Sequence, residues 1–147
     1  MPSESTLTYQ VYVAPIIAIA GNDVPPGQSR STWSPISATL ICGRYDAVLV
    51  DPLMTIEQGM AVAHWVSTTG KNLTTVYVTH GHGDHWFGLG AVRERFPGVR
   101  AVATPAVVKA MRASSPRYSS HSGSPGSPAR SLMTTPLPIR WTGRPSS

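Results

Sequence analysis

The order of apolar and polar residues along the chain predicts alternating strands and helices, beginning with strands. Residues 7–14 alternate apolar with polar side chains and residues 16–20 continue the run, which predicts an early strand or hairpin. Residues 37–42 and 47–50 flank a turn at residues 43–46 and predict a β-hairpin. The second of these strands is apolar throughout, as is typical of a strand that is buried on both faces.

The first helix is predicted over residues 55–69. Thr55 can cap its N-terminus, and Gln58 three residues later completes a capping-box pattern. Gly70 follows the last helical residue, and glycine commonly ends helices. Apolar residues recur at helical spacing within this segment, at Ile56, Met60, Ala63 and Val66.

The next segment repeats the alternation of strand and helix. Residues 73–79 are rich in β-branched and aromatic side chains and predict a strand, and residues 87–96 predict a short helix. Residues 99–103 predict another strand. A final helix is predicted over residues 104–112, because it opens with a capping threonine and a proline at the first helical position. The alternation predicts an α/β fold.

The length of 147 residues fits one domain, but the composition changes after residue 112. Residues 113–147 contain ten serines and six prolines, have no acidic residue and show neither a strand nor a helix period. Such a segment cannot bury enough apolar surface to offset its chain entropy. We therefore predict a folded portion over residues 1–112 and a disordered, low-complexity tail over residues 113–147.

The formal net charge of +5 comes entirely from the C-terminal segment. All seven acidic residues lie before residue 112 and are balanced there by basic ones. A high isoelectric point can indicate binding to nucleic acid, but arginines spread over a segment with few aromatic residues do not form a basic patch on a folded face. We expect a small-molecule substrate and no nucleic-acid partner. The surplus arginines are Arg112, Arg117, Arg130, Arg140 and Arg144.

Cysteine content and hydropathy predict the location of the protein. Cys42 is the only cysteine, which excludes an intramolecular disulfide and fits a reducing compartment. We expect it to be a small buried hydrophobe in a strand. The apolar run at residues 11–20 is short, is interrupted by Pro15 and has no basic residue ahead of it, so neither a signal peptide nor a membrane span is predicted. The expected location is the cytoplasm.

The candidate functional side chains are concentrated in the run Thr-His-Gly-His-Gly-Asp-His at residues 79–85. His80, His82, Asp84 and His85 are residue types that bind zinc and similar divalent ions. Alternate residues of an extended segment point the same way, so His80 and His82 can converge on one ion. Asp84 and His85, turning into the helix, face a second position beside it. Two such ions can share a hydroxide that is nucleophilic near neutral pH and can polarise a carbonyl or phosphoryl oxygen.

This run resembles the metal-binding signature of the metallo-β-lactamase superfamily. The pattern His-x-His-x-Asp-His directly after a strand carries the resemblance. The run Val-Leu-Val-Asp at residues 48–51, ahead of a helix, resembles the strand and aspartate that precede the signature in that family. The resemblance covers about residues 7–112. It implies an αββα sandwich, of which this chain has the N-terminal half, and the activity of a metal-dependent hydrolase.

The resemblance also implies roles for individual residues. His80 and His82 match ligands of the first zinc of the family site, and Asp84 and His85 match ligands of the second. Asp84 is in addition the candidate catalytic residue, and Asp51 matches a position that supports the site by hydrogen bonding. Histidine rather than arginine after Asp84 is more similar to the glyoxalase, lactonase and general hydrolase branches. Two zinc ions are implied, and iron or manganese also suits such ligands.

The later ligands of the family site have no match in this sequence. The family completes its site with a histidine, a bridging aspartate and a further histidine from later strands, whereas Asp84 is the last aspartate here. We expect His121, the one later histidine, to be a solvated tail residue, and His64 to be a helix residue without a metal role. Two interpretations follow: an active hydrolase, completed by another chain, or a truncated, catalytically incompetent fragment that at most binds metal weakly.

A half sandwich has consequences for the surface and for the substrate. An uncovered sheet would expose its edge and a face formed by Val48, Val50, Val76 and Val78, which favours self-association. In this superfamily specificity comes from loops and from the second half of the fold. Ester, lactone, thioester, β-lactam and phosphodiester substrates therefore all remain open.

Overall fold

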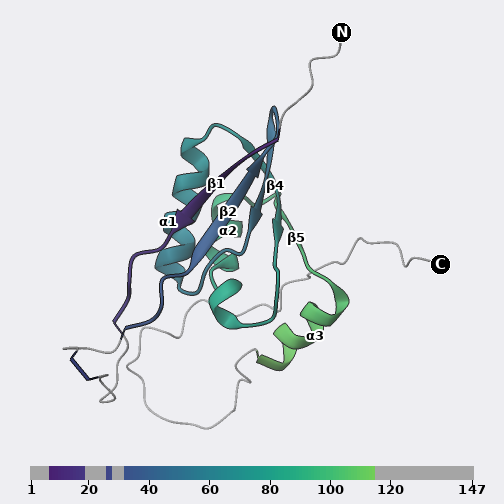
Figure 1. The fold of residues 1–147 in the computed structure, drawn as a ribbon. Coiled ribbons are helices and arrows are strands. Elements are labelled where there is room, and N and C mark those ends of the chain that lie inside the picture. The colour runs from purple at the N-terminus through teal and green to yellow at the C-terminus, as the bar shows by residue number, and fades with distance from the viewer. Residues whose placement is uncertain (1–6, 19–25, 28–31, 115–147) are drawn as a thin grey trace, which may run out of the picture.

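A computed structural model describes residues 7–18, 26–27 and 32–114, and the structural statements below concern these residues. They form a five-stranded sheet with three α-helices (Figure 1). The predicted tail lies outside the described residues from position 115 onward. The strands are β1 (Thr8–Val13), β2 (Ser37–Cys42), β3 (Asp46–Val50), β4 (Asn72–Tyr77) and β5 (Arg100–Val102); the helices are α1 (Ile56–Thr68), the 3₁₀ helix η1 (Gly83–His85), α2 (Leu89–Arg95) and α3 (Pro105–Ser114).

The topology of the sheet brings two loops to one edge. The strand order is β1-β2-β3-β4-β5, with β1, β2 and β3 antiparallel and β3, β4 and β5 parallel. The carboxyl ends of parallel strands lie at the same edge of a sheet. Val50 pairs with Tyr77 there, so the chain after β3 and the chain after β4 leave the sheet side by side. The predicted metal-binding run follows β4 at this edge.

Most predicted elements are confirmed, including the hairpin of β2 and β3 and the α/β fold class. The capping box at the start of α1 is present, since the Thr55 side chain accepts from the Gln58 N–H and the Gln58 side chain accepts from the Thr55 N–H. The N-terminal run differs in part, because β1 pairs with β2 and the following residues contribute one isolated bridge, Ala18 to Thr32. No helix in the described part of the chain is long and apolar enough to cross a membrane.

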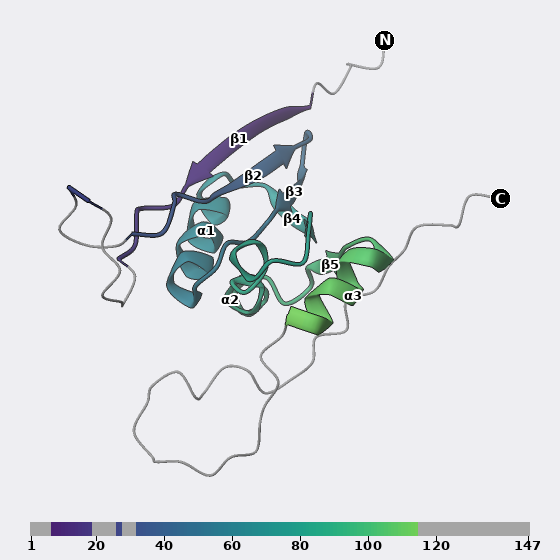
Figure 2. The ribbon, with the colours of Figure 1, turned by 60° about the horizontal axis from the view of Figure 1, so that its bottom comes forward.

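Helices α1 and α2 lie on the same side of the sheet and form its covered face (Figures 1 and 2). The strands direct alternate side chains toward these helices, and the resulting cluster is fully or almost fully buried. Cys42 belongs to it, 2% exposed, which confirms the prediction of a small buried hydrophobe. The cluster includes Leu40, Leu49 and Val76 from the strands, Val62 and Val66 from α1, and Leu89 and Val92 from α2.

Two of the four apolar positions predicted at helical spacing in α1 lie on its buried face, since Ala63 and Val66 are 2% and 0% exposed. Ile56 and Met60 are 40% and 59% exposed, whereas Gly59 is buried. The reason is the close packing of α1 against the start of α2, where a Cβ at Gly59 would lie 2.5 Å from the carbonyl oxygen of Gly88. Only glycine permits this approach, so the helix turns a small residue inward and leaves two large ones at the surface.

The opposite face of the sheet, which we call the open face, has a different composition from the one predicted. Val76 and Val78 are fully buried: Val76 belongs to the covered face, and Val78 packs with Ala103 and Met111 near α3. The alternation of side chains along β4 places them there. Val48 and Val50 do lie on the open face and are half-buried, so β3 is not buried on both faces. The exposed apolar residues of the open face are Tyr9, Val11, Val13 and Ile41.

Candidate metal centre

The loop after β3 holds Asp51 in an unusual backbone conformation. Asp51 and Leu53 have φ angles of 58° and 68°, in the left-handed region that large side chains rarely adopt. Neighbouring elements hold the loop in place: the Asp51 N–H donates to the Tyr77 carbonyl over 3.0 Å, and the Gly88 N–H donates to the Leu53 carbonyl over 3.0 Å. Strain of this kind persists where the surroundings fix it, commonly at functional sites. Here it turns the Asp51 side chain toward the chain that follows β4.

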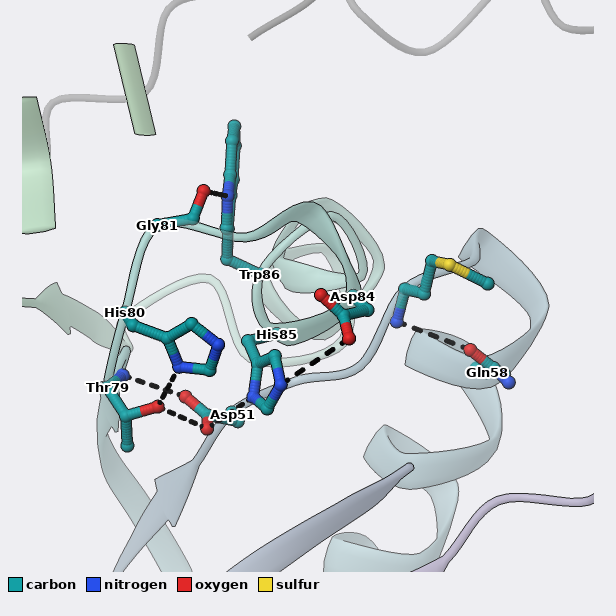
Figure 3. A network of polar contacts seen from close by, with 9 residues as sticks. Asp51, Gln58, Thr79, His80, Gly81, Asp84, His85 and Trp86 are labelled. Atoms are coloured by element: carbon teal, nitrogen blue, oxygen red, sulfur yellow. Dashed lines mark hydrogen bonds and ion pairs between the residues drawn. The ribbon is translucent and has the colours of Figure 1, made fainter. Parts of the chain in front are cut away.

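Asp51 is buried, with its side chain 10% exposed, and both carboxylate oxygens accept hydrogen bonds (Figure 3). Oδ1 accepts from the backbone N–H of Thr79 over 2.8 Å. Oδ2 accepts from the Thr79 hydroxyl over 2.6 Å and lies 2.8 Å from Nδ1 of His85. A buried carboxylate is tolerated when it is hydrogen-bonded in this way. Asp51 therefore connects the end of β3 to the metal-binding run.

The four predicted ligands lie close together at this edge of the sheet. Ligand atoms of His80, His82 and Asp84 lie within 4.8 Å of one another, and those of Asp51, His80 and His85 form a second such group. Nε2 of His85 is 3.5 Å from Oδ2 of Asp84. The ring centroids of His80 and His85 lie 3.8 Å apart, with the ring planes tilted by 51°. His80 thus belongs to both groups, and its ring connects the two sides of the cluster.

The donor set of this cluster fits a divalent metal ion. Imidazole nitrogens and carboxylate oxygens are the donors that zinc takes in catalytic sites, where three typically come from the protein. The group of His80, His82 and Asp84 consists of three proposed ligands. The second group shares His80 with the first and includes Asp51, whose oxygens already contact Thr79 and His85. His82 is exposed while His80, Asp84 and His85 are half-buried, so solvent reaches the cluster. That the four residues bind metal remains a prediction.

Helix α3 holds the metal-binding run from the other side. The Ser114 hydroxyl lies 2.8 Å from the Gly81 carbonyl, the nearest of three carbonyl oxygens around it. The Trp86 indole N–H donates to the same Gly81 oxygen over 3.2 Å. The contact is close, because a Cβ at Gly81 would lie 2.5 Å from the Cβ of Ala110. The run is therefore fixed between β4 and the last turn of α3.

Sequence reasoning missed several of these supporting residues. Thr79 directly precedes the first histidine, which is the only local signal that could have marked it. Ser114 carried no signal, because its contact with Gly81 spans 33 positions. His64 is exposed on α1 and belongs to neither ligand group, and its lack of a metal role stays a prediction. His121 lies outside the described residues.

Comparison with solved structures shows the same architecture in metallo-β-lactamases. The metallo-β-lactamase FIM-1 from Pseudomonas aeruginosa, in its mono-zinc form, matches 71% of this chain and 44% of its own at 17% identity, with a TM-score of 0.53. The DIM-1 metallo-β-lactamase, exposed to ceftazidime, matches 76% of this chain and 49% of its own at 14% identity, with a TM-score of 0.52. At this identity the likeness concerns the fold, and the chain spans about half the length of these enzymes. No curated protein matches the chain in sequence.

A family model supplies the sequence relationship. The model described as the metallo-beta-lactamase superfamily matches residues 31–145. The match includes β2 to α3 with the whole metal-binding run, and it extends past residue 112, where we placed the end of the folded portion. It covers well over half of the chain, and so this protein belongs to the metallo-β-lactamase superfamily.

Proposed function

We propose that the chain is a metal-dependent hydrolase that acts on an ester, lactone, thioester or related bond of a small molecule, with His80, His82, Asp84 and His85 as metal ligands. The observation that carries the proposal is the convergence of these ligand atoms at the carboxyl edge of the sheet. Bound zinc would make water nucleophilic near neutral pH and polarise the oxygen of the scissile group. Two zinc ions are proposed, and iron or manganese also suits the donor set.

The contacts of the cluster support distinct tasks for its residues. Asp51 Oδ2 accepts a hydrogen bond from the Nδ1–H of His85, which leaves the unprotonated Nε2 of His85 as the ligand atom. Asp84 Oδ2 lies 3.5 Å from this Nε2, so both atoms can bind one ion. A carboxylate oxygen of Asp84 not used for the metal can accept a proton from an attacking water molecule, which is the catalytic role we propose for it.

Metal titration and a hydrolysis panel together test this proposal. Purified full chain, stripped of metal, is titrated with Zn²⁺, Fe²⁺ and Mn²⁺ and assayed with an aryl ester, a lactone, a thioester, a β-lactam and a phosphodiester. We expect at least one bound zinc per chain and turnover of one substrate that a chelator abolishes. Less than one equivalent of every metal, with no chelator-sensitive turnover, would overturn the proposal for this chain.

A matched pair of variants separates the cluster from other histidines and carboxylates. Asp84→Asn removes the proposed carboxylate ligand and should abolish turnover and weaken zinc binding by 10-fold or more (~1.4 kcal/mol). His64→Gln changes an exposed histidine of α1 that lies in neither ligand group and should leave both unchanged. Equal losses in the two variants would contradict the assignment of the site.

The alternative function is that of a catalytically incompetent fragment that binds metal weakly. Its support is that the chain spans 44% and 49% of the two solved enzymes that it resembles in fold. Zinc binding without chelator-sensitive turnover of any substrate would favour this alternative over the hydrolase. Turnover restored by a second protein would instead favour a site that another chain completes.

A second copy of this chain is the partner that the open face supports. Tyr9, Val11 and Ile41 are 74%, 50% and 37% exposed on neighbouring strands, and β1 is an edge strand of the sheet. Apolar faces and free strand edges favour self-association. Light scattering across a concentration series should show a mass above that of the monomer, and replacing Val11 and Ile41 by threonine should lower it. A monomer at every concentration would contradict this partner.

A reducing compartment, such as the cytoplasm, is the location we propose. Its support is the single cysteine, Cys42, which is buried and unpaired. Fractionation of cells that express the full chain tests it, and recovery of the protein in an oxidising compartment would contradict it.

A further inference from the structure

The Thr79 side chain lies between the buried carboxylate and the first histidine of the metal-binding run (Figure 3). Its Oγ1 is 2.6 Å from Asp51 Oδ2 and 2.9 Å from His80 Nδ1. An ionised carboxylate can only accept hydrogen bonds, so the single hydroxyl proton of Thr79 is donated to Asp51. The contact with His80 must then run the other way, with an Nδ1–H donating to the hydroxyl oxygen. This direction leaves Nε2 of His80 without a proton and free to bind metal.

The same carboxylate oxygen acts on the second histidine directly. Asp51 Oδ2 is 2.8 Å from Nδ1 of His85, and an acceptor at this position requires an Nδ1–H. His85 is therefore also held with its Nε2 unprotonated. The ring centroids of the two histidines lie 3.8 Å apart with the ring planes tilted by 51°, so the two imidazoles belong to one cluster. A metal-ligating imidazole usually donates its other N–H to such a partner, which fixes the tautomer and the orientation of the ring.

We propose that Thr79 is a positioning residue that links Asp51 to His80. Its hydroxyl donates to Asp51 and accepts from His80 Nδ1–H, and we call this pair of hydrogen bonds the relay. Through the relay and its direct contact with His85, one buried carboxylate sets the tautomers of two proposed ligands. The inference rests on the proposed function, because it assigns a purpose to Thr79 only if His80 and His85 bind metal. Asp51 reaches His85 directly, whereas it reaches His80 only through the Thr79 hydroxyl. Removing that hydroxyl should therefore affect His80 and leave His85 in place.

The geometry makes Thr79→Val a selective change. Valine keeps the shape of threonine, and the backbone N–H of residue 79 still donates to Asp51 Oδ1. Asp51 thus keeps its contacts with the backbone and with His85, and only the relay is lost. Thr79→Ser retains a hydroxyl and should retain the relay. Thr39→Val is the matched control, since Thr39 is a half-buried strand threonine on the open face.

The experiment has one measurement without metal and one with it. In metal-free protein at about pH 8, long-range ¹⁵N–¹H NMR of the imidazoles should show His80 and His85 as Nδ1–H tautomers in the wild type, Thr79→Ser and Thr39→Val. In Thr79→Val, His80 should populate the Nε2–H tautomer and His85 should not change. Zinc affinity, measured by competition with a chromophoric chelator, should fall about 10-fold in Thr79→Val alone, at the lower end of such losses.

The outcomes distinguish the relay from the proposed function. An unchanged His80 tautomer in Thr79→Val, or an equal loss of affinity in Thr79→Ser, would overturn the relay. A wild type that binds no zinc would overturn the proposed function, while the tautomers would still report on the hydrogen bonds. If urea unfolding shows that Thr79→Val does not fold, Thr79→Ala takes its place, because it removes the same hydroxyl without adding a methyl group.

Discussion

The two faces of the sheet differ although the same strands build them. In β2, Leu40 has no solvent exposure on the covered face, and its neighbour Ile41 is 37% exposed on the open face. The helices α1 and α2 account for the difference, since both pack on one side (Figure 2). The covered face is complete within the described residues and supports the metal-binding run. On the open face, no helix of the described residues covers the apolar side chains, so its behaviour in solution depends on what binds it.

The largest effect on stability is expected from a substitution on the covered face of β2, compared with one on its open face. Leu40→Ala should lower the free energy of unfolding by about 3 kcal/mol, because it leaves a cavity in a fully buried cluster, and losses of this type span roughly 2–5 kcal/mol. Ile41→Ala should lower it by less than about 1 kcal/mol, because its side chain is partly solvated. Urea unfolding of both variants at low protein concentration measures the difference.

The same pair sharpens the question of what covers the open face. If a second copy binds there, Ile41→Ala should become more costly as the protein concentration rises, whereas the cost of Leu40→Ala should stay constant. Equal losses for both variants at high dilution would mean that the open face is buried within a single chain. That result would contradict the asymmetry of the two faces described here.

The contact between α1 and the start of α2 offers a second prediction on the covered face. Gly88→Ala should destabilise the protein by about 2–3 kcal/mol, because the added methyl group would overlap the carbonyl oxygen of Pro52. A backbone atom cannot move aside as a flexible side chain can. Gly90→Ala, two residues later, adds a methyl group with no atom within 4 Å and should instead stabilise α2 by up to about 1 kcal/mol. Thermal unfolding that shifts both variants in the same direction would contradict the close approach of Gly88 to the Pro52 carbonyl.

The contact of α3 with the metal-binding run predicts a smaller, functional effect. Gly81→Ala should weaken zinc binding about 10-fold, or ~1.4 kcal/mol, because its methyl group would push the run away from Ala110. Adding Ala110→Gly to this variant removes the nearest clashing group and should recover part of the affinity. Chelator competition measures both. An unchanged affinity in Gly81→Ala would mean that α3 does not position the ligands.

The elements that sequence predicts well are those fixed by local pattern. The capping box depends on Thr55 and Gln58, three positions apart, and it was recognisable before the structure was known. The run at residues 79–85 is recognisable for the same reason, since both signals lie within short windows of the chain. The role of Asp51 was implied only by the family resemblance.

The features that sequence did not predict depend on contacts between distant segments. Helical spacing grouped Ile56 and Met60 with two residues that are buried, but the approach of Gly59 to Gly88 leaves Ile56 and Met60 exposed. The prediction that Val76 lies on the open face was wrong. Val76 pairs with Leu49 and not with Val48, and a one-residue change of register moves a strand residue to the other face of the sheet. The Thr79 hydroxyl could not be assigned a role from sequence, because its hydrogen-bond acceptor is the Asp51 carboxylate, 28 positions away.

The smallest effect is expected at the N-terminus of α1, at the rim of the covered face. Thr55→Ala removes the oxygen that accepts from the Gln58 N–H and should lower the free energy of unfolding by about 1 kcal/mol. Gln58 still accepts from the N–H groups of Met54 and Thr55, so half of the capping box survives. Thr55→Ser keeps the oxygen and should unfold at the same urea concentration as the wild type; a loss equal to that of alanine would show that the threonine methyl group, rather than the cap, stabilises this end. Zinc affinity should not change in either variant, because Asp51 is held by Tyr77 and Thr79 and not by the helix cap.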